Sequence, residues 1–229
     1  MTGVRFDNIH SYNDLGLTLT NFTITPPTPK IYKVDIAGAD GSIDLTESLT
    51  GDVKYEERII DMEFGMIGQW RDVQNKYSQV QNALHGKKFS EIVFDDDENF
   101  YHVGRVSAVA LGSEPLIGTI TIQCVVEPYK YDWGDDWLWD SFSFETGIIN
   151  EMIGLKVNGS LDVTYIGQRK KYIPYIITST PMSVVFNGQT YNLQSGKNKI
   201  FEIEFHEGTN ILKFIGNGTV TIENKGGSF

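Results

Sequence analysis

One stretch of this chain carries a strong helical pattern, and nearly every other segment shows the alternation or the turn residues of β-strands. In residues 67–84, apolar side chains recur three or four positions apart, which places them on one stripe of a 3.6-residue period. The stripe consists of Ile67, Trp70, Val73, Tyr77, Val80 and Leu84. Gly86 follows where a left-handed cap would end the helix. The chain is therefore predicted to be mainly β, with one helix whose stripe packs against a sheet.

Strands are predicted before the helix from alternating apolar residues. These residues are Leu15, Leu17 and Leu19 on one parity and Phe22 and Ile24 on the other. The change of parity near Asn21 predicts a bulge or a bend. The prolines that follow end the strand, because proline cannot donate to a ladder. A second strand is predicted around Ile60, Met62 and Phe64, which share one parity.

Three strands are predicted after the helix, over residues 89–94, 100–106 and 117–126. An acidic hairpin tip, residues 95–99, joins the first two. Alternate residues of the last strand, from Ile120 to Val126, share a buried parity that includes Cys124. The single cysteine is thus predicted to be a small core residue, and an intrachain disulfide is excluded.

The second half of the chain is predicted to be a run of short strands. The pairs Asn158-Gly159, Asn187-Gly188 and Asn217-Gly218 each separate β-prone runs, and Asn-Gly is a strong signal for a type I′ hairpin turn. Residues 201–205 alternate apolar and acidic side chains, as a half-exposed strand does. Residues 129–140 concentrate aromatic and acidic residues, and we place the domain boundary there, between domains 1–131 and 132–229.

Composition and charge exclude several classes of protein. Of the 229 residues, 40% are hydrophobic and 21% charged, which is enough apolar material for a sizeable core. The net charge of −11 argues against nucleic-acid binding, which depends on clustered lysine and arginine. The apolar runs fall short of a membrane-spanning helix, and the first residues lack the apolar segment of a signal peptide.

The sequence offers little catalytic or metal-binding chemistry. Asp95, Asp97 and Asn99 have the spacing of the first calcium-loop ligands, but Phe100 replaces the glycine and Val106 the bidentate glutamate. An acidic hairpin tip is the preferred interpretation. The four histidines are scattered without metal-ligand spacing, and no nucleophile or phosphate-loop motif is present. We predict that the chain is not an enzyme and holds no metal or cofactor.

Three tryptophans are the best candidates for a ligand platform. Close together in the sequence are Trp133, Trp137 and Trp139. The faces of their rings could stack on the sugars of a cell wall. The alternative, which we prefer, is that these large rings fill the joint between the two domains.

Residues 34–51 form a long segment with three glycines and four acidic residues but no aromatic residue. Such a segment buries little surface by itself, and loops of this length are uncommon unless they have a function. It is either a surface loop or an arm that packs on another subunit. The candidate interface residues are Gly38, Asp40, Gly41, Asp44 and Leu45.

Taken together, four segments in order resemble the distal tail protein of long-tailed phages that infect Gram-positive bacteria. They are NIHSYNDLGL (8–17), GADGSIDLTESLTG (38–51), LHGKKFSEIVFDDDENFYHVGRV (84–106) and VEPYKYD (126–132). A looser resemblance, GTNILKFIGNGTVTIENKGG (208–227), extends to the C-terminal domain of that family. The resemblance implies an N-terminal β-sandwich-like domain with one helix and a hairpin, followed by a β-sandwich akin to galectins or carbohydrate-binding modules.

The resemblance also implies a function in the virion. The first domain would form a homohexameric ring at the tail tip, between the tail tube protein and the tail-associated lysin or fibre protein, with DNA passing through the hole. The second domain would project outward and could carry a receptor-binding protein. The virion would be assembled in the host cytoplasm. The alternative function is a carbohydrate-binding β-sandwich module for host cell-wall sugars.

Overall fold

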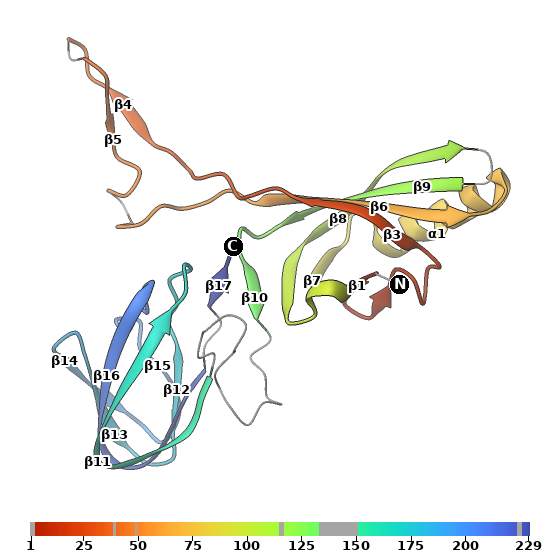
Figure 1. Ribbon diagram of the computed structural model, residues 1–229. Helices are drawn as coiled ribbons and strands as arrows, with labels where there is room; N and C mark the ends of the chain where they lie inside the picture. The colour runs from red at the N-terminus through yellow and green to blue at the C-terminus, as the bar shows by residue number, and fades with distance from the viewer. Residues whose placement is uncertain (1–2, 39, 49, 115–116, 133–150, 224–225) are drawn as a thin grey trace. The chain divides into compact units, whose positions relative to one another are not determined.

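The computed structural model describes the chain except for residues 1–2, 39, 49, 115–116, 133–150 and 224–225 (Figure 1). The described residues form two compact units, Met1–Lys130 together with Phe229, and Tyr131–Ser228. Strands dominate both units, and the described residues contain a single α-helix. The prediction of a mainly β chain with one helix is confirmed.

The first unit is a curved antiparallel sheet with one helix beside it. Its elements are β1 (Val4–Phe6), β2 (Ile9–His10), β3 (Thr18–Ile24), β4 (Lys33–Asp35), β5 (Ser42–Asp44), β6 (Arg58–Ile67), α1 (Trp70–Leu84), β7 (Lys88–Phe94), the 3-10 turn η1 (Asp95–Asp97), β8 (Phe100–Glu114) and β9 (Ile117–Val126). Neighbouring strands follow the order β2-β1-β7-β8-β9-β6-β3, while β4 and β5 pair only with each other. The helix packs against β8 and β9.

The alternation read from the sequence locates the core of this unit. Every second residue of β9 from Ile120 to Val126 is fully buried, as are Ile60, Met62 and Phe64 in β6. The register of β3 against β6 shifts between Leu19 and Asn21. Both the strand parities and the bulge are therefore confirmed.

Cys124 lies in this core with no exposed surface. Burial, with a smaller contribution from Asp61, raises the pKa of its thiol far above the usual range. Because the thiolate is the reactive form, we expect a thiol reagent to label the native chain at least ~100-fold more slowly than the chain in denaturant. Rapid labelling under native conditions would contradict the buried position.

The helix is shorter than predicted at its start. Ile67 is the last residue of β6, paired with Ile117 of β9, and α1 begins at Trp70. Ile67 and Trp70 are 89% and 50% exposed, so they do not belong to the buried stripe. The rest of the stripe is correct, because Val73, Val80 and Leu84 are buried and Tyr77 packs against the core. Gly86 adopts a positive φ of 74° after the helix, as predicted.

The second unit is built on two long paired strands. Strand β10 (Lys130–Asp132) begins at the last residue of the first unit. The other elements of the second unit are β11 (Glu151–Gly167), β12 (Tyr175–Thr178), β13 (Met182–Phe186), β14 (Gln189–Leu193), β15 (Gly196–Lys199), β16 (Gly208–Glu223) and β17 (Gly227–Ser228). Strand β16 pairs with β11 along its length. On its other edge, β16 pairs first with β13 and then with β12. A second hydrophobic core, which includes Phe205, Leu212 and Phe214, fills this unit.

One of the three Asn-Gly pairs makes the predicted hairpin turn. Asn187 and Gly188 join β13 to β14 with φ angles of 48° and 79°, as a type I′ turn requires. The hairpin predictions for the other two pairs are wrong. Asn158-Gly159 lies within β11 and Asn217-Gly218 within β16, and Asn158 faces Asn217 across the ladder.

The glycines of β16 allow a close approach rather than a turn. A Cβ atom on Gly216 would lie 2.7 Å from the Met182 Cβ, and one on Gly218 would overlap the hydroxyl of Thr180. The segment between β12 and β13 runs along this edge of β16, and the Ser179 N–H donates to the Thr219 carbonyl over 3.0 Å. A side chain at either glycine would clash with this segment.

Residues 201–205 do not form the predicted strand. Ile203 and Phe205 are buried in the second core, so the alternation does separate buried from exposed positions. Phe205 makes a single bridge with Tyr172, but Phe201 is 71% exposed in a turn. No described helix has the length and hydropathy that a membrane crossing requires.

Candidate functional site

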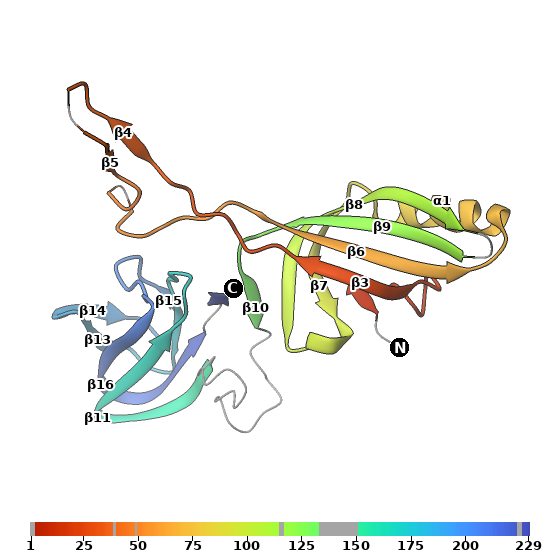
Figure 2. The ribbon, with the colours of Figure 1, turned by 45° about the horizontal axis from the view of Figure 1, so that its top comes forward.

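The segment predicted to be a loop or an arm contains a two-stranded hairpin, β4–β5, which extends away from the end of the sheet (Figures 1 and 2). Its register pairs Val34 with Ile43, and all six residues of the two strands are exposed. Gly38 and Gly41 have φ angles of 85° and 76° in the turn between the strands. Such a hairpin is marginally stable without further packing.

Backbone hydrogen bonds hold the base of the hairpin. The Lys30 N–H donates to the Lys54 carbonyl over 2.7 Å, and the Glu56 N–H donates to the Thr28 carbonyl over 2.8 Å. Pro29 and Tyr55 form a bridge between these bonds. Residues 28–30 and 54–56 therefore leave the sheet side by side. The segment between them, residues 31–53, is called the projection below.

The projection presents apolar side chains to solvent. The exposed ones are Ile31, Tyr32, Val34, Ile36 and Ile43, with exposed fractions from 38% to 62%. Residues 33–52 also carry five acidic side chains against one lysine. Exposed apolar groups rimmed by charges are typical of a surface that contacts another protein.

The predicted interface residues lie on this projection. Gly38, Asp40, Gly41 and Asp44 are exposed, and Leu45 is half-buried with its N–H donating to the Tyr32 carbonyl over 2.8 Å. The Asp44 carboxylate accepts from the Thr46 N–H over 2.9 Å, and its hydrogen bonds with Thr46 lower its pKa. The structure brings these residues together, while their contact with another subunit stays a prediction.

The tryptophan platform lies outside the described residues. Trp133, Trp137 and Trp139 fall within residues 133–150, so both interpretations of the three rings stay predictions.

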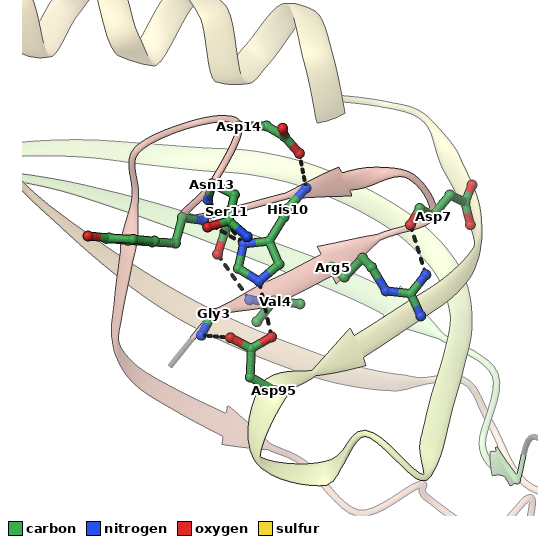
Figure 3. Close-up of polar contacts among 10 residues, drawn as sticks. Gly3, Val4, Arg5, Asp7, His10, Ser11, Asn13, Asp14 and Asp95 are labelled. Atoms are coloured by element: carbon green, nitrogen blue, oxygen red, sulfur yellow. Dashed lines mark hydrogen bonds and ion pairs between the residues drawn. The ribbon is translucent and has the colours of Figure 1, made fainter. Parts of the chain in front are cut away.

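Two aspartates of the acidic tip make polar contacts with other residues of the first unit. The Gly3 N–H donates to Asp95 Oδ2 over 2.6 Å, and His10 Nε2 lies 3.1 Å from Asp95 Oδ1 (Figure 3). Lys130 Nζ lies 3.2 Å from Asp97 Oδ2. The described residues contain no group of three or more His, Cys, Asp or Glu side chains that could hold a metal ion.

His10 connects the first strands to this tip. Its Nδ1 accepts from the N–H groups of Tyr12 and Asn13, at 3.0 and 3.2 Å, so its proton lies on Nε2 and is donated to Asp95. Its own N–H donates to Asp14 Oδ2 over 2.7 Å (Figure 3). The sequence analysis missed this pair, because 85 residues separate its members.

A second polar pair is buried at the end of the sheet that leads to the hairpin. Arg58 and His102 are 5% and 4% exposed, and Arg58 Nη2 donates to His102 Nδ1 over 3.3 Å. Burial, then Arg58, then Lys130, lower the pKa of His102 to about 3. The imidazole is therefore neutral and accepts the hydrogen bond.

The buried His102 should make the stability of the first unit depend on pH. Its pKa is lower in the folded chain than in the unfolded chain, so the unfolded chain binds the proton more readily. This contribution to stability is complete above about pH 6.5 and is lost as the pH falls toward 3. Between pH 7 and pH 4.5 we expect His102 to account for a fall of about 2–3 kcal/mol in the free energy of unfolding.

Labelling of Cys124 with dithiodipyridine during urea unfolding reports on the first unit alone, because Cys124 is the single cysteine and lies in its core. The matched variant is His102→Gln, which keeps every carboxylate that titrates in the same range. A variant with the same pH dependence as the parent chain would refute the role of His102.

Together these features define a class of fold: a mainly β chain of two units, the first with one helix and a projecting hairpin. A solved structure with this fold is the crystal structure of SPP1 Dit (gp 19.1), described as a paradigm of the hub adsorption apparatus in phages that infect Gram-positive bacteria. The TM-score is 0.66 and the identity 15%, over 98% of this chain and 99% of SPP1 Dit. No protein-family model and no curated protein matches the sequence. The resemblance is therefore confirmed at the level of the fold.

Proposed function

We propose that this chain is a structural hub of a phage tail tip. The observation that supports this most is the shared fold, which extends over nearly the whole of this chain and of SPP1 Dit, a phage tail hub protein. The proposed unit of assembly is a homohexameric ring through which DNA passes. The chain would hold the neighbouring tail proteins in position and would not catalyse a reaction.

The projecting hairpin is the proposed contact between neighbouring subunits. None of its described residues belongs to either hydrophobic core. Five apolar side chains between Ile31 and Ile43 remain exposed, and a hairpin of this kind gains stability when it packs on another surface. Gly38, Asp40, Gly41, Asp44 and Leu45 would lie at this contact.

The charge of the chain suits a passage for DNA. Six copies would carry 6 × −11 = −66, and carboxylates that face the hole would repel phosphate and prevent DNA from sticking. The ring would join the tail tube protein on one face and the tail-associated lysin or fibre protein on the other. The second unit would project outward and could carry a receptor-binding protein.

A second candidate function is the binding of cell-wall carbohydrate by the second unit. On β12 and β15, Lys197 lies 4.2 Å and Lys199 5.0 Å from the ring centre of Tyr175, and the exposed Phe201 follows β15. These ammonium groups lie over the ring, so a sugar that stacks on Tyr175 would displace them, and they could then donate hydrogen bonds to its hydroxyls. Saturable binding to purified host walls, lost in Tyr175→Ala, would support this candidate.

The location of the chain in the virion tests the hub proposal. Antibodies against the chain, with gold labels, should decorate the tail tip of intact virions in electron micrographs. Labels on the capsid, or a chain that is absent from purified virions, would refute the proposal.

A further inference from the structure

A cavity of about 340 Å³ lies in the first unit where β3 ends and β6 begins. Its lining residues are Ile24, Pro26, Pro27, Tyr55, Arg58 and Phe229. Arg58 is the one charged residue among them. The volume lies in the range of small ligand-binding pockets, which combine mostly apolar walls with a few polar groups that orient the ligand.

The walls of the cavity include packed aromatic rings. Phe229 stacks on Tyr129 with 5.2 Å between ring centres and 11° between planes, and it meets Tyr55 edge to face at 4.8 Å. Mutual packing of these rings restricts their rotation. An apolar side chain that entered the cavity would therefore meet rigid rings, at a low cost in conformational entropy.

Arg58 carries a buried positive charge without a counter-charge. It makes no ion pair with any described residue, and its Nε atom is buried without a hydrogen-bond partner. Among the described residues its side chain hydrogen-bonds to His102, which is a neutral acceptor. Buried charges in proteins are normally paired with an opposite charge, and an arginine presents its donors in a fork that matches a carboxylate.

From this cavity we propose that the first unit binds a segment of another protein in which a carboxylate stands beside an aliphatic or aromatic side chain. The carboxylate would pair with Arg58, and the apolar side chain would lie against the prolines and the aromatic rings. Charge complementarity requires an anion, and the apolar walls disfavour a hydrated inorganic ion.

The surface around the cavity favours an extended segment over a small molecule. Phe22 and Ile24, on β3, are 43% and 36% exposed, so apolar surface continues beyond the opening along this strand. A peptide could cover both the cavity and this strand, whereas a small acid would leave the strand exposed.

Two matched peptides test the proposal on the intact chain. The probes are acetyl-Leu-Glu-Phe-amide and its neutral counterpart acetyl-Leu-Gln-Phe-amide, with binding followed by NMR chemical shifts. We expect the acidic peptide to bind at least ~10-fold more tightly, because a charge-assisted pair with Arg58 forms in an apolar site. We expect Arg58→Lys to reduce this preference and Arg71→Met, at an exposed arginine of α1, to leave it unchanged.

Several results would overturn the proposal. Equal affinities for the two peptides would show that Arg58 does not select a carboxylate, and this comparison needs only the parent chain, so it stands even if the Arg58 variant fails to fold. Acetate or phosphate that bound as tightly as the acidic peptide would indicate a simple anion site. Tighter binding of a peptide with residues 41–47 of this chain would identify the occupant as a second copy, and not another protein.

Discussion

Replacing residues 31–53 with an Asn-Gly turn is expected to leave a folded chain that no longer forms a ring. Lys30 and Lys54 flank the deletion and are joined by a 2.7 Å backbone hydrogen bond, so a two-residue turn can close the chain. The described residues of the deleted segment belong to neither core, and removing the segment should not unfold the first unit. Light scattering would report the mass, and circular dichroism would report the fold.

A milder variant separates the apolar contact from the rest of the hairpin. Ile36→Ser with Ile43→Ser removes two side chains that are 48% and 49% exposed in the single chain. If both are buried between subunits, the loss is about 3 kcal/mol for each contact, or a ~100-fold weaker association. The control is Ile211→Ser, a change at a 59% exposed isoleucine of the second unit. Rings that survive the deletion intact would refute the interface role of the hairpin.

Gly104→Ala is expected to destabilise the first unit by about 3 kcal/mol or more. Gly104 pairs with Val126 between β8 and β9. A Cβ atom there would overlap the Val125 carbonyl oxygen and lie 2.6 Å from the Val126 Cα. These are backbone atoms of a central strand, so they cannot move aside without disrupting the ladder. Urea unfolding followed by Cys124 labelling measures the loss.

Gly112→Ala is the matched control for this effect. Gly112 also lies in β8 and also pairs with a residue of β9, Thr119. A Cβ atom on Gly112 would lie 3.7 Å from the Thr119 Cβ, which is an ordinary contact distance. We expect a change within about 0.5 kcal/mol of the parent chain. If the two alanine variants unfold alike, the close approach at Gly104 does not determine stability.

The parts of the fold that could be predicted are those in which one face of an element is buried. Alternation located β9 and its buried residues, because a strand against a core must place every second side chain inward. The helical period failed at Ile67, where the β6–β9 ladder continues through a residue whose spacing also suits the helix stripe. Pairing across the sheet determined the structure there, and a helical period alone cannot show such pairing.

The Asn-Gly pairs show a second limit of prediction. The dipeptide indicates where positive φ angles are tolerated, but not whether the chain turns. At Asn187 the chain turns, whereas at Gly218 the missing side chain makes room for the neighbouring segment at Thr180. Only the tertiary structure distinguishes the two uses of glycine.

The buried pair of Arg58 and His102 had no local signal in the sequence. Arg58 and Gly104, two residues after His102, both face Val126 from opposite sides of β9, although 44 residues separate Arg58 from His102. The projecting segment was easier to predict, because residues 34–51 are unusually poor in large side chains and rich in glycine and acids. Composition can thus indicate a projecting segment, but a polar pair across a sheet requires the register.

The most direct test of the hub account is the mass of the purified chain in solution, measured together with negative-stain images over a range of concentrations. The account predicts an annulus of six subunits, about six times the 25.8 kDa of one chain, formed alone or with the neighbouring tail proteins. A chain that remains a single particle at high concentration and in the presence of those proteins would contradict it.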